Sequence, residues 1–214
     1  MFLNEADNER LEQVKAKLGF PSKTATVSRL LGLYKSESER ELPPATYESV
    51  FSDDKPVIVS GEPRSGKTTT VKAILTQYAG NVFVVDVTGK TLNEYPEFRK
   101  VSWERATSMT WRGKAVRRIR WIPNPDLKAS IDQASRVFDR MNQVKSSGAL
   151  LNWVVTVEEA HRFAGDASFR ALIDEAGKFV KKLILVTPEK QLFAGMAKVL
   201  APALHEGITK VFLS

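Results

Sequence analysis

The sequence contains no cysteine among its 214 residues. A disulfide framework, a thiolate metal site and a cysteine nucleophile are therefore excluded. Histidine is scarce as well, since only His161 and His205 are present, too few for a histidine-based metal centre without carboxylates. No apolar run approaches the roughly 20 residues that cross a bilayer, and the polar start is no secretory signal. We expect a cytoplasmic protein without a membrane segment.

The composition suits one well-buried domain with a small appendage, because 43% of the residues are hydrophobic. We predict the boundary near a linker that ends at Pro44, with an appendage over residues 1–42 and a main domain over 45–214. The appendage has two apolar stripes at helical spacing, separated by a Gly-Phe-Pro-Ser break at residues 19–22. It faintly resembles the helical part of ribbon-helix-helix DNA-binding domains. The alternative is a helical hairpin that packs on the main domain or on another subunit.

The stretch from Gly61 to Thr68 reads G-E-P-R-S-G-K-T and fits the phosphate-binding pattern G-x-x-x-x-G-K-[ST]. A β-branched apolar run at residues 56–60 precedes it, and residues 69–78 follow with helical spacing. Strand, loop and helix therefore occur in the order that lets backbone amides surround a polyphosphate. The alternative is an accidental glycine-rich turn before a helix.

Each position of this loop has a chemical purpose in binding ATP and Mg²⁺. Lys67 is expected to reach the β- and γ-phosphates, and the Thr68 hydroxyl is expected to bind the magnesium ion. The residues predicted to bind the nucleotide are Gly61, Glu62, Pro63, Arg64, Ser65, Gly66, Lys67, Thr68 and Thr69.

Further strands and helices alternate along the chain, which predicts a mostly parallel sheet with its ligand at the carboxyl ends of the strands. The expected strands cover residues 82–86, 117–122 and 150–157, and the expected helices cover 130–145 and 166–176. Asp86 ends the first of these strands, Gly89 is placed to turn the chain away after it, and Gly177 is placed to end the last helix.

Two adjacent glutamates, Glu158 and Glu159, follow the strand at 150–157. Paired carboxylates at the end of a buried strand supply the second half of a P-loop ATPase site. By position, Glu158 is expected to hold Mg²⁺ and Glu159 to deprotonate the attacking water. We expect these glutamates and the loop near Ser65 to converge on one triphosphate across adjoining strands. The alternative is an exposed strand end capped by acids.

Eight basic residues and one acid, Glu104, occupy the segment 99–120, and three tryptophans lie among or beside them. Basic groups with interleaved aromatic rings are typical of a track for a phosphate backbone. The proposed nucleic-acid contacts are Arg112, Lys114, Arg117, Arg118 and Arg120. The alternatives are a surface ribbon whose tryptophans pack inward and a subunit contact.

The stretch V-E-E-A-H-R-F at residues 157–163 resembles the D-E-A-H-R-F type of acidic motif in the FtsK/HerA superfamily of ring-forming DNA-pumping ATPases. The resemblance covers about residues 55–214, although only the P-loop and the acidic motif are specific. It implies a RecA-like α/β fold, a sensor strand at 182–187 and a closing strand at 208–213. Short members of the group include viral genome-packaging ATPases.

Two departures from the family pattern affect the site. Glu158 replaces the usual aspartate, and its extra methylene pushes the carboxylate outward. The family places a glutamine directly after the sensor threonine, whereas here Pro188 follows Thr187 and the nearest glutamine is Gln191. The family also supplies an arginine from a neighbouring subunit to the transferring phosphoryl group. The sequence offers three candidates for it, Arg140, Arg162 and Arg170.

The sequence thus predicts a RecA-like P-loop ATPase whose catalytic residues are Lys67, Glu158, Glu159 and Thr187. ATP and Mg²⁺ are the expected cofactors, double-stranded DNA and further copies of the chain in a ring are the expected partners, and capsid or replicon proteins are further candidates. A second hypothesis is an ATP-dependent regulatory DNA-binding protein that uses the appendage to recognise an operator. A small-molecule phosphotransferase is disfavoured, because Glu159 suits the activation of water.

Overall fold

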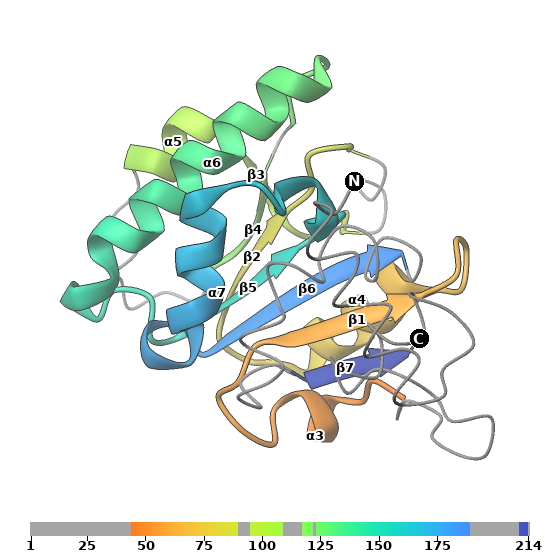
Figure 1. Ribbon diagram of the computed structural model, residues 1–214. Coiled ribbons are helices and arrows are strands. Elements are labelled where there is room, and N and C mark those ends of the chain that lie inside the picture. Colours follow the sequence, from red (N-terminus) through yellow and green to blue (C-terminus); the bar gives the residue numbers. More distant parts are fainter. Residues whose placement is uncertain (1–43, 90–94, 109–116, 122, 189–209, 214) are drawn as a thin grey trace, which may run out of the picture.

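The computed structural model describes residues 44–89, 95–108, 117–121, 123–188 and 210–213 (Figure 1). Within them, seven strands form one sheet in the order β3-β4-β2-β5-β6-β1-β7, and every neighbouring pair is parallel. The strands are β1 (Val57–Gly61), β2 (Asn81–Val85), β3 (Arg99–Val101), β4 (Arg118–Trp121), β5 (Trp153–Val157), β6 (Lys182–Pro188) and β7 (Lys210–Leu213). The predicted α/β fold with a parallel central sheet is confirmed.

Helices cover both faces of the sheet (Figure 1). They are α3 (Tyr47–Val50), α4 (Lys67–Gln77), α5 (Trp103–Ser108), α6 (Leu127–Val144) and α7 (Ala167–Phe179), with short 3-10 turns η1 (Lys145–Ser147) and η2 (Ala160–Phe163). The larger core cluster joins one face of the sheet to α5, α6, α7 and η2. The smaller cluster joins the other face to α3 and α4.

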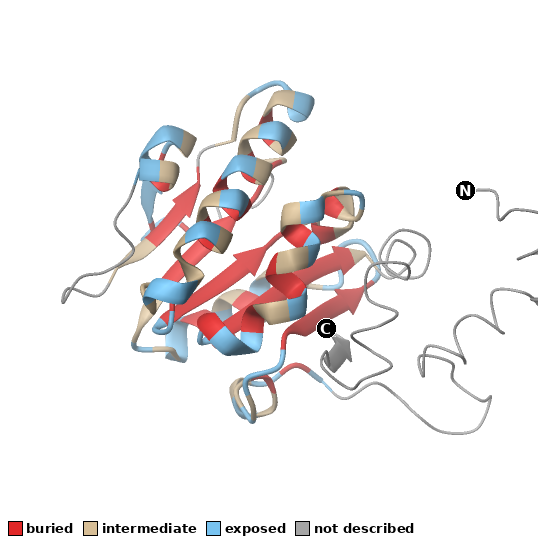
Figure 2. Ribbon diagram, turned by 60° about the vertical axis from the view of Figure 1, so that its left-hand side comes forward, coloured by how far each residue is buried: buried red, intermediate tan, exposed pale blue. Residues whose placement is uncertain are grey.

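The central strands are buried on both faces, which is why their sequences are continuous apolar runs rather than alternating ones (Figure 2). In β5, Val155 and Val157 belong to the larger cluster, whereas Val154 belongs to the smaller one. Successive side chains point to opposite faces of a strand. The polar groups that follow the strands are thereby delivered to one edge of the sheet.

Two helix boundaries differ from the sequence prediction for identifiable reasons. Helix α6 begins at Leu127 because Asp126 caps it, with its carboxylate accepting a hydrogen bond from the Ala129 amide at 2.7 Å. Helix α7 continues through Gly177 to Phe179. A Cβ atom at Gly177 would lie 2.9 Å from the Asp54 carbonyl oxygen, so this glycine permits close packing and does not end the helix.

The basic segment also contains elements that the sequence did not predict. The edge strand β3 carries Arg99 and Lys100 on the surface, and α5 follows it. Trp103 and Trp121 pack in or against the larger core cluster. Several earlier predictions lie outside the described residues, namely the helices of the 1–42 appendage, Arg112, Lys114 and Gln191. None of the helices in the described ranges is long and apolar enough to cross a membrane.

Lys182, at the start of β6, has a fully buried side chain that fastens this strand to the segment before β1. Its ammonium group donates to the carbonyl oxygens of Asp53 and Lys55, at 2.5 and 2.7 Å, and lies 3.3 Å from Asp53 Oδ1. We expect Lys182→Met to lower the free energy of unfolding by about 3 kcal/mol, since it removes a buried cation and leaves partly buried acceptors without it. Urea unfolding measures this loss.

The neighbouring Lys181 provides a matched control, because its side chain is 46% exposed and pairs loosely with Asp54 at 3.8 Å. Lys181→Met should change the free energy of unfolding by less than about 1 kcal/mol. Equal effects of the two substitutions would show that the buried cation does not fasten β6.

Candidate active site

The P-loop joins β1 to α4 and presents an open face to solvent, since residues 62–65 are all exposed. Gly66 is the N-cap of α4 and has a left-handed backbone with φ of 90°. Arg64 is left-handed as well, with φ of 68°. The first amides of a helix have no partner inside it and attract anions. The loop is therefore shaped to receive a phosphate group.

Lys67 lies folded back over the loop. Its ammonium donates to the carbonyl oxygens of Gly61 at 3.1 Å and Glu62 at 2.6 Å. Burial lowers the pKa of Lys67, while the nearby carboxylates of Glu159 and Glu158 act in the opposite direction. Lys67 therefore lies close enough to Glu158 and Glu159, the two glutamates predicted from the sequence, for their charges to affect its pKa.

Glu158 is almost fully buried at the carboxyl end of β5, with 3% of its surface exposed. The Thr68 hydroxyl donates to its Oε2 atom at 3.5 Å, and the Tyr95 hydroxyl donates to its Oε1 atom at 3.2 Å. The first contact joins α4 to β5 directly. A carboxylate and a hydroxyl at this separation form a donor set that suits a hard cation such as Mg²⁺.

Asp86 lies near Glu158 and affects its ionisation. Burial, followed by the charge of Asp86, raises the pKa of Glu158 to about 8, although the Tyr95 hydrogen bond acts against this rise. One oxygen of Asp86 accepts bonds from the amides of Thr88 and Gly89, at 2.9 and 3.1 Å, and from the Thr88 hydroxyl. Gly89 turns the chain with φ of 67°. Burial and the charge of Asp86 thus favour the protonated form of Glu158.

Glu159 adopts a left-handed backbone, with φ of 52° and ψ of 40°, and forms the N-cap of η2. This conformation is unfavourable for a residue with a side chain. Its Oε2 atom lies 3.5 Å from His161 Nε2 and 3.8 Å from Arg162 Nε. Glu158 and Glu159 thus adopt different environments, one buried beneath Thr68 and the other beside basic groups on a turn.

The prediction that the P-loop and the glutamates lie on adjoining strands is wrong, because β6 lies between β1 and β5. The Thr68–Glu158 contact nevertheless brings both regions together across the end of β6. Thr187, near the carboxyl end of β6, is fully buried, and its hydroxyl lies 3.3 Å from His161 Nδ1. The inserted strand therefore contributes to the site from between its two halves.

Two residues assigned to the nucleic-acid track point into the protein. Arg118 donates to the carbonyl oxygens of Leu75 and Tyr78 at the end of α4, and its guanidinium lies 5.8 Å from the centre of the Phe98 ring. Arg120 is only 6% exposed, and its Nε and Nη1 atoms have no hydrogen-bond partner within the part of the chain that the structure describes. Their assignment to a surface track is corrected, because strand β4 turns both guanidinium groups toward protein.

The three candidate arginines have different surroundings. Arg170, on α7, donates to the Ala164 carbonyl oxygen at 2.9 and 3.1 Å and so closes the turn after η2. Arg140, on α6, donates to Gln143 at 3.4 Å. Arg162 is the one that lies beside Glu159 within its own chain.

The sequence analysis did not identify Tyr95 as a site residue. No motif precedes it, and its position beside Glu158 depends on the tertiary fold.

No protein-family model and no curated protein matches this sequence. One similar solved structure, described as "ATPase", has 11% sequence identity and a TM-score of 0.48, over 89% of this chain and 79% of that chain. The Hef helicase domain of Pyrococcus furiosus has 15% identity and a TM-score of 0.37, over 80% of this chain and 38% of that chain. The strand order and the P-loop between β1 and α4 assign the RecA-like α/β fold of P-loop NTPases to this chain.

Proposed function

We propose that this protein is a Mg²⁺-dependent ATPase. The observation that carries the proposal is the 3.5 Å contact between the Thr68 hydroxyl and Glu158, because it joins a phosphate-binding loop to an acidic strand end. Lys67 is within electrostatic influence of both glutamates. Phosphate-binding, cation-binding and basic groups thus meet at one edge of the sheet, as phosphoryl transfer requires.

The residues present fit a magnesium ion, since Mg²⁺ prefers a few protein oxygens together with phosphates and water. Thr68 and Glu158 would hold it. The bound ion would neutralise the charge that develops on the phosphate oxygens. Glu158 must give up its proton when it accepts a cation, so metal binding should release a proton near neutral pH.

The remaining steps fall to side chains of the chain itself. The first amides of α4 hold the phosphates, and Lys67 leaves the carbonyl oxygens of Gly61 and Glu62 to reach them. Glu159 accepts a proton from water as that water attacks the terminal phosphorus. The proton then resides on the Glu159 carboxylate, and the bond between the terminal phosphorus and the oxygen that bridges to the β-phosphate breaks, which releases ADP and inorganic phosphate.

Coupling of hydrolysis to DNA movement in a ring, with genome packaging as one use, is the finer part of the proposal. It is supported by the sequence resemblance to FtsK/HerA ATPases and by the exposed Arg99, Lys100 and Arg105 on β3 and α5. The competing hypothesis is a nucleotide-controlled DNA-binding regulator. Either protein would bind DNA, so the response of the hydrolysis rate decides between them.

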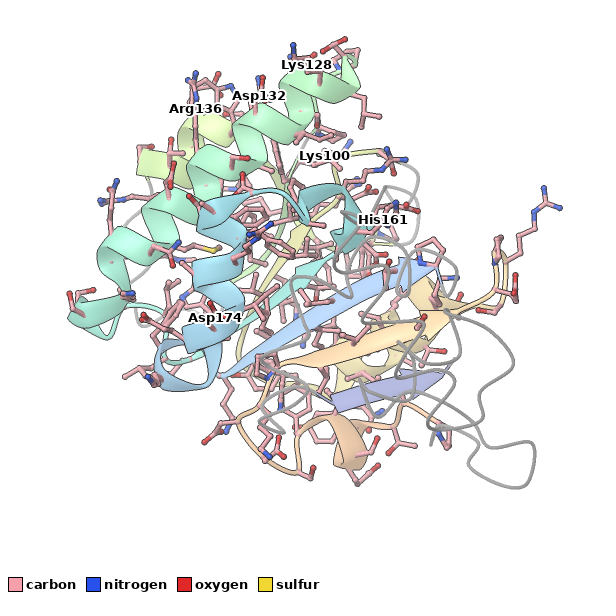
Figure 3. The ribbon with its side chains drawn as sticks, in the orientation of Figure 1. Lys100, Lys128, Asp132, Arg136, His161 and Asp174 are labelled. Carbon is pink, nitrogen blue, oxygen red and sulfur yellow. The ribbon has the colours of Figure 1, made fainter. Side chains whose placement is uncertain are left out.

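The test measures phosphate release with and without Mg²⁺ in the wild-type protein and in Lys67→Ala. We expect hydrolysis to need Mg²⁺ and to fall at least about 100-fold in Lys67→Ala, because the cation that stabilises the phosphoryl group is lost. Lys128→Ala, on the exposed side of α6, removes the same charge and should leave the rate unchanged (Figure 3). Hydrolysis that survives in Lys67→Ala would overturn the proposal.

Duplex DNA of arbitrary sequence is then added to the same assay. A motor should hydrolyse ATP faster in its presence, and the solution mass should correspond to several copies of the chain. If DNA leaves the rate of ATP hydrolysis unchanged, and the protein binds one specific operator sequence without nucleotide, the regulator hypothesis is favoured instead.

A further inference from the structure

Three polar side chains stand in series next to the nucleotide site, one from β6 and two from η2 and its N-cap. Thr187 from β6 lies 3.3 Å from His161 Nδ1, and His161 Nε2 lies 3.5 Å from Glu159 Oε2. Thr187 is fully buried, and the His161 side chain is 14% exposed. Figure 3 shows His161 at the edge of the sheet toward which β5 and β6 run. The series therefore links the inserted strand to Glu159.

The positions of the protons decide which group donates and which accepts in the series from Thr187 through His161 to Glu159. A carboxylate oxygen only accepts hydrogen bonds, so a hydrogen bond across the 3.5 Å between His161 Nε2 and Glu159 Oε2 requires the ring proton on Nε2. Burial lowers the pKa of His161 and favours the neutral ring. In a neutral ring the other nitrogen is an acceptor, so the Thr187 hydroxyl donates to Nδ1. Each group thus fixes the hydrogen-bonding state of the next.

We propose that His161 and Thr187 are positioning residues that orient Glu159, with Thr187 acting through His161 rather than by touching a phosphate. The buried position of Thr187 supports this role, because its hydroxyl already serves the histidine and no part of the residue reaches solvent. The inference rests on the proposed function, in which Glu159 activates water. It replaces the direct sensor role that the sequence resemblance implied for Thr187.

The Glu159 carboxylate needs other side chains to hold its orientation, because its backbone lies in a turn and not in a regular strand or helix. The residue lies at a turn between β5 and η2 in a left-handed conformation, and its carboxylate has contacts only at ion-pair distances, to His161 and Arg162, among the described interactions. Hydrogen bonds of catalytic groups commonly tighten when the substrate binds. A base displaced by about 1 Å can lose a factor of about 100 in rate.

The kinetic test compares His161→Ala, Thr187→Val and the double variant. Each single substitution should lower kcat about 10- to 100-fold, while the dissociation constant for ATP stays within about twofold, since no phosphate contact is removed. The double variant should be no slower than the slower single variant, because both remove the same linkage. Multiplied losses, unchanged kcat or weakened ATP binding in the single variants would overturn the inference.

Conservative variants keep the test valid if the larger changes disturb folding. Thr187→Ser retains the hydroxyl, and His161→Gln retains an amide group that can donate to Glu159, so both should keep more activity than Thr187→Val and His161→Ala. Thr76→Val removes an exposed hydroxyl that donates to the Lys72 carbonyl oxygen and should leave kcat unchanged. Equal activity in Thr187→Ser and Thr187→Val would contradict a hydrogen-bonding role.

A spectroscopic test does not depend on hydrolysis. The chain has two histidines, so ¹⁵N-histidine labelling gives two imidazole rings, with His205 as the internal reference. We expect His161 to show a protonated Nε2 and an acceptor Nδ1, and Thr187→Val to shift the Nδ1 resonance while Thr76→Val does not. A protonated Nδ1 would overturn the inference. A protein with the expected spectrum but without ATPase activity would instead overturn the proposed function, and with it the role of the series.

Discussion

Glu159→Gln should bind ATP with unchanged affinity and hydrolyse it about 1000-fold more slowly than the wild-type protein. The amide has the shape of the carboxylate but cannot accept a proton from water. Its oxygen can still accept the contact from His161 Nε2, which lies 3.5 Å from the present carboxylate oxygen. The substitution therefore separates proton transfer from positioning. Single-turnover phosphate release and equilibrium nucleotide binding measure the two quantities.

Asp174→Asn is a suitable control, because it removes the same charge from the exposed surface of α7 (Figure 3). Its rate should match that of the wild-type protein. If Glu159→Gln retained more than about a tenth of the wild-type rate, another group would have to accept the proton, and the base would be misassigned.

Glu158→Gln should abolish Mg²⁺-dependent hydrolysis and yet make the nucleotide-free protein more stable at high pH. Burial and the charge of Asp86 raise the pKa of Glu158 to about 8, from an ordinary value of 4.5. Glutamine stays uncharged at every pH, as the protonated carboxyl group is, and its one amide oxygen can accept a hydrogen bond from either Thr68 or Tyr95, which contact different oxygens of Glu158. The substitution removes the unfavourable free energy of ionising a buried carboxyl group in the folded protein. It also removes the negative charge that would bind Mg²⁺.

The sign follows from the two protonation states. Below pH 4.5 the folded and unfolded chains both hold the proton, so the group has no effect on the pH dependence. Between pH 4.5 and about 8 only the folded chain holds it, and the free energy of unfolding falls as the pH rises. Each pH unit lowers it by about 1.4 kcal/mol, so the total loss is on the order of 5 kcal/mol. Above about pH 8 the loss is complete.

Urea unfolding at pH 5, 7 and 9, without nucleotide or Mg²⁺, measures this dependence. The stability difference between Glu158→Gln and the wild-type protein should grow from pH 5 to pH 9. Glu104→Gln removes the same charge from an exposed position on α5 and should show no such growth. Parallel curves for Glu158→Gln and the wild-type protein would contradict the burial of an unpaired carboxyl group.

The sequence was sufficient to predict the elements that depend on local patterns. The strand-loop-helix order around Lys67 and the apolar run before Glu158 give the β1–α4 unit and β5, because buried parallel strands have continuous apolar sequences. Neighbours in the sheet are not set locally, and the position of β6 between β1 and β5 was therefore mispredicted. Short pieces such as β3, in a charged segment, have no periodicity to read.

The sequence predicts the environment of a side chain only where the residue belongs to a motif with a defined chemical role. Thr68 and Glu158 were expected at one site, and the structure brings them within 3.5 Å. Arg118 and Arg120 were read as surface groups from their charge, but alternation along β4 turns them into the fold. Tyr95 lies 63 positions from Glu158 in the sequence, and His161 lies 26 positions from Thr187. No local sequence pattern therefore predicts these two contacts.

Among the strands that the structure describes, β3 is the outermost on one side of the sheet, and it has only three residues, two of them exposed and positively charged. Charged, short outer strands resist pairing with a strand from another molecule, because the approaching chain would meet like charges over too little backbone to compensate. Continuous sheets across subunits are therefore disfavoured at this side. Any higher-order assembly that forms here must use side chains of helices or loops, which can be changed one at a time without disturbing the strands.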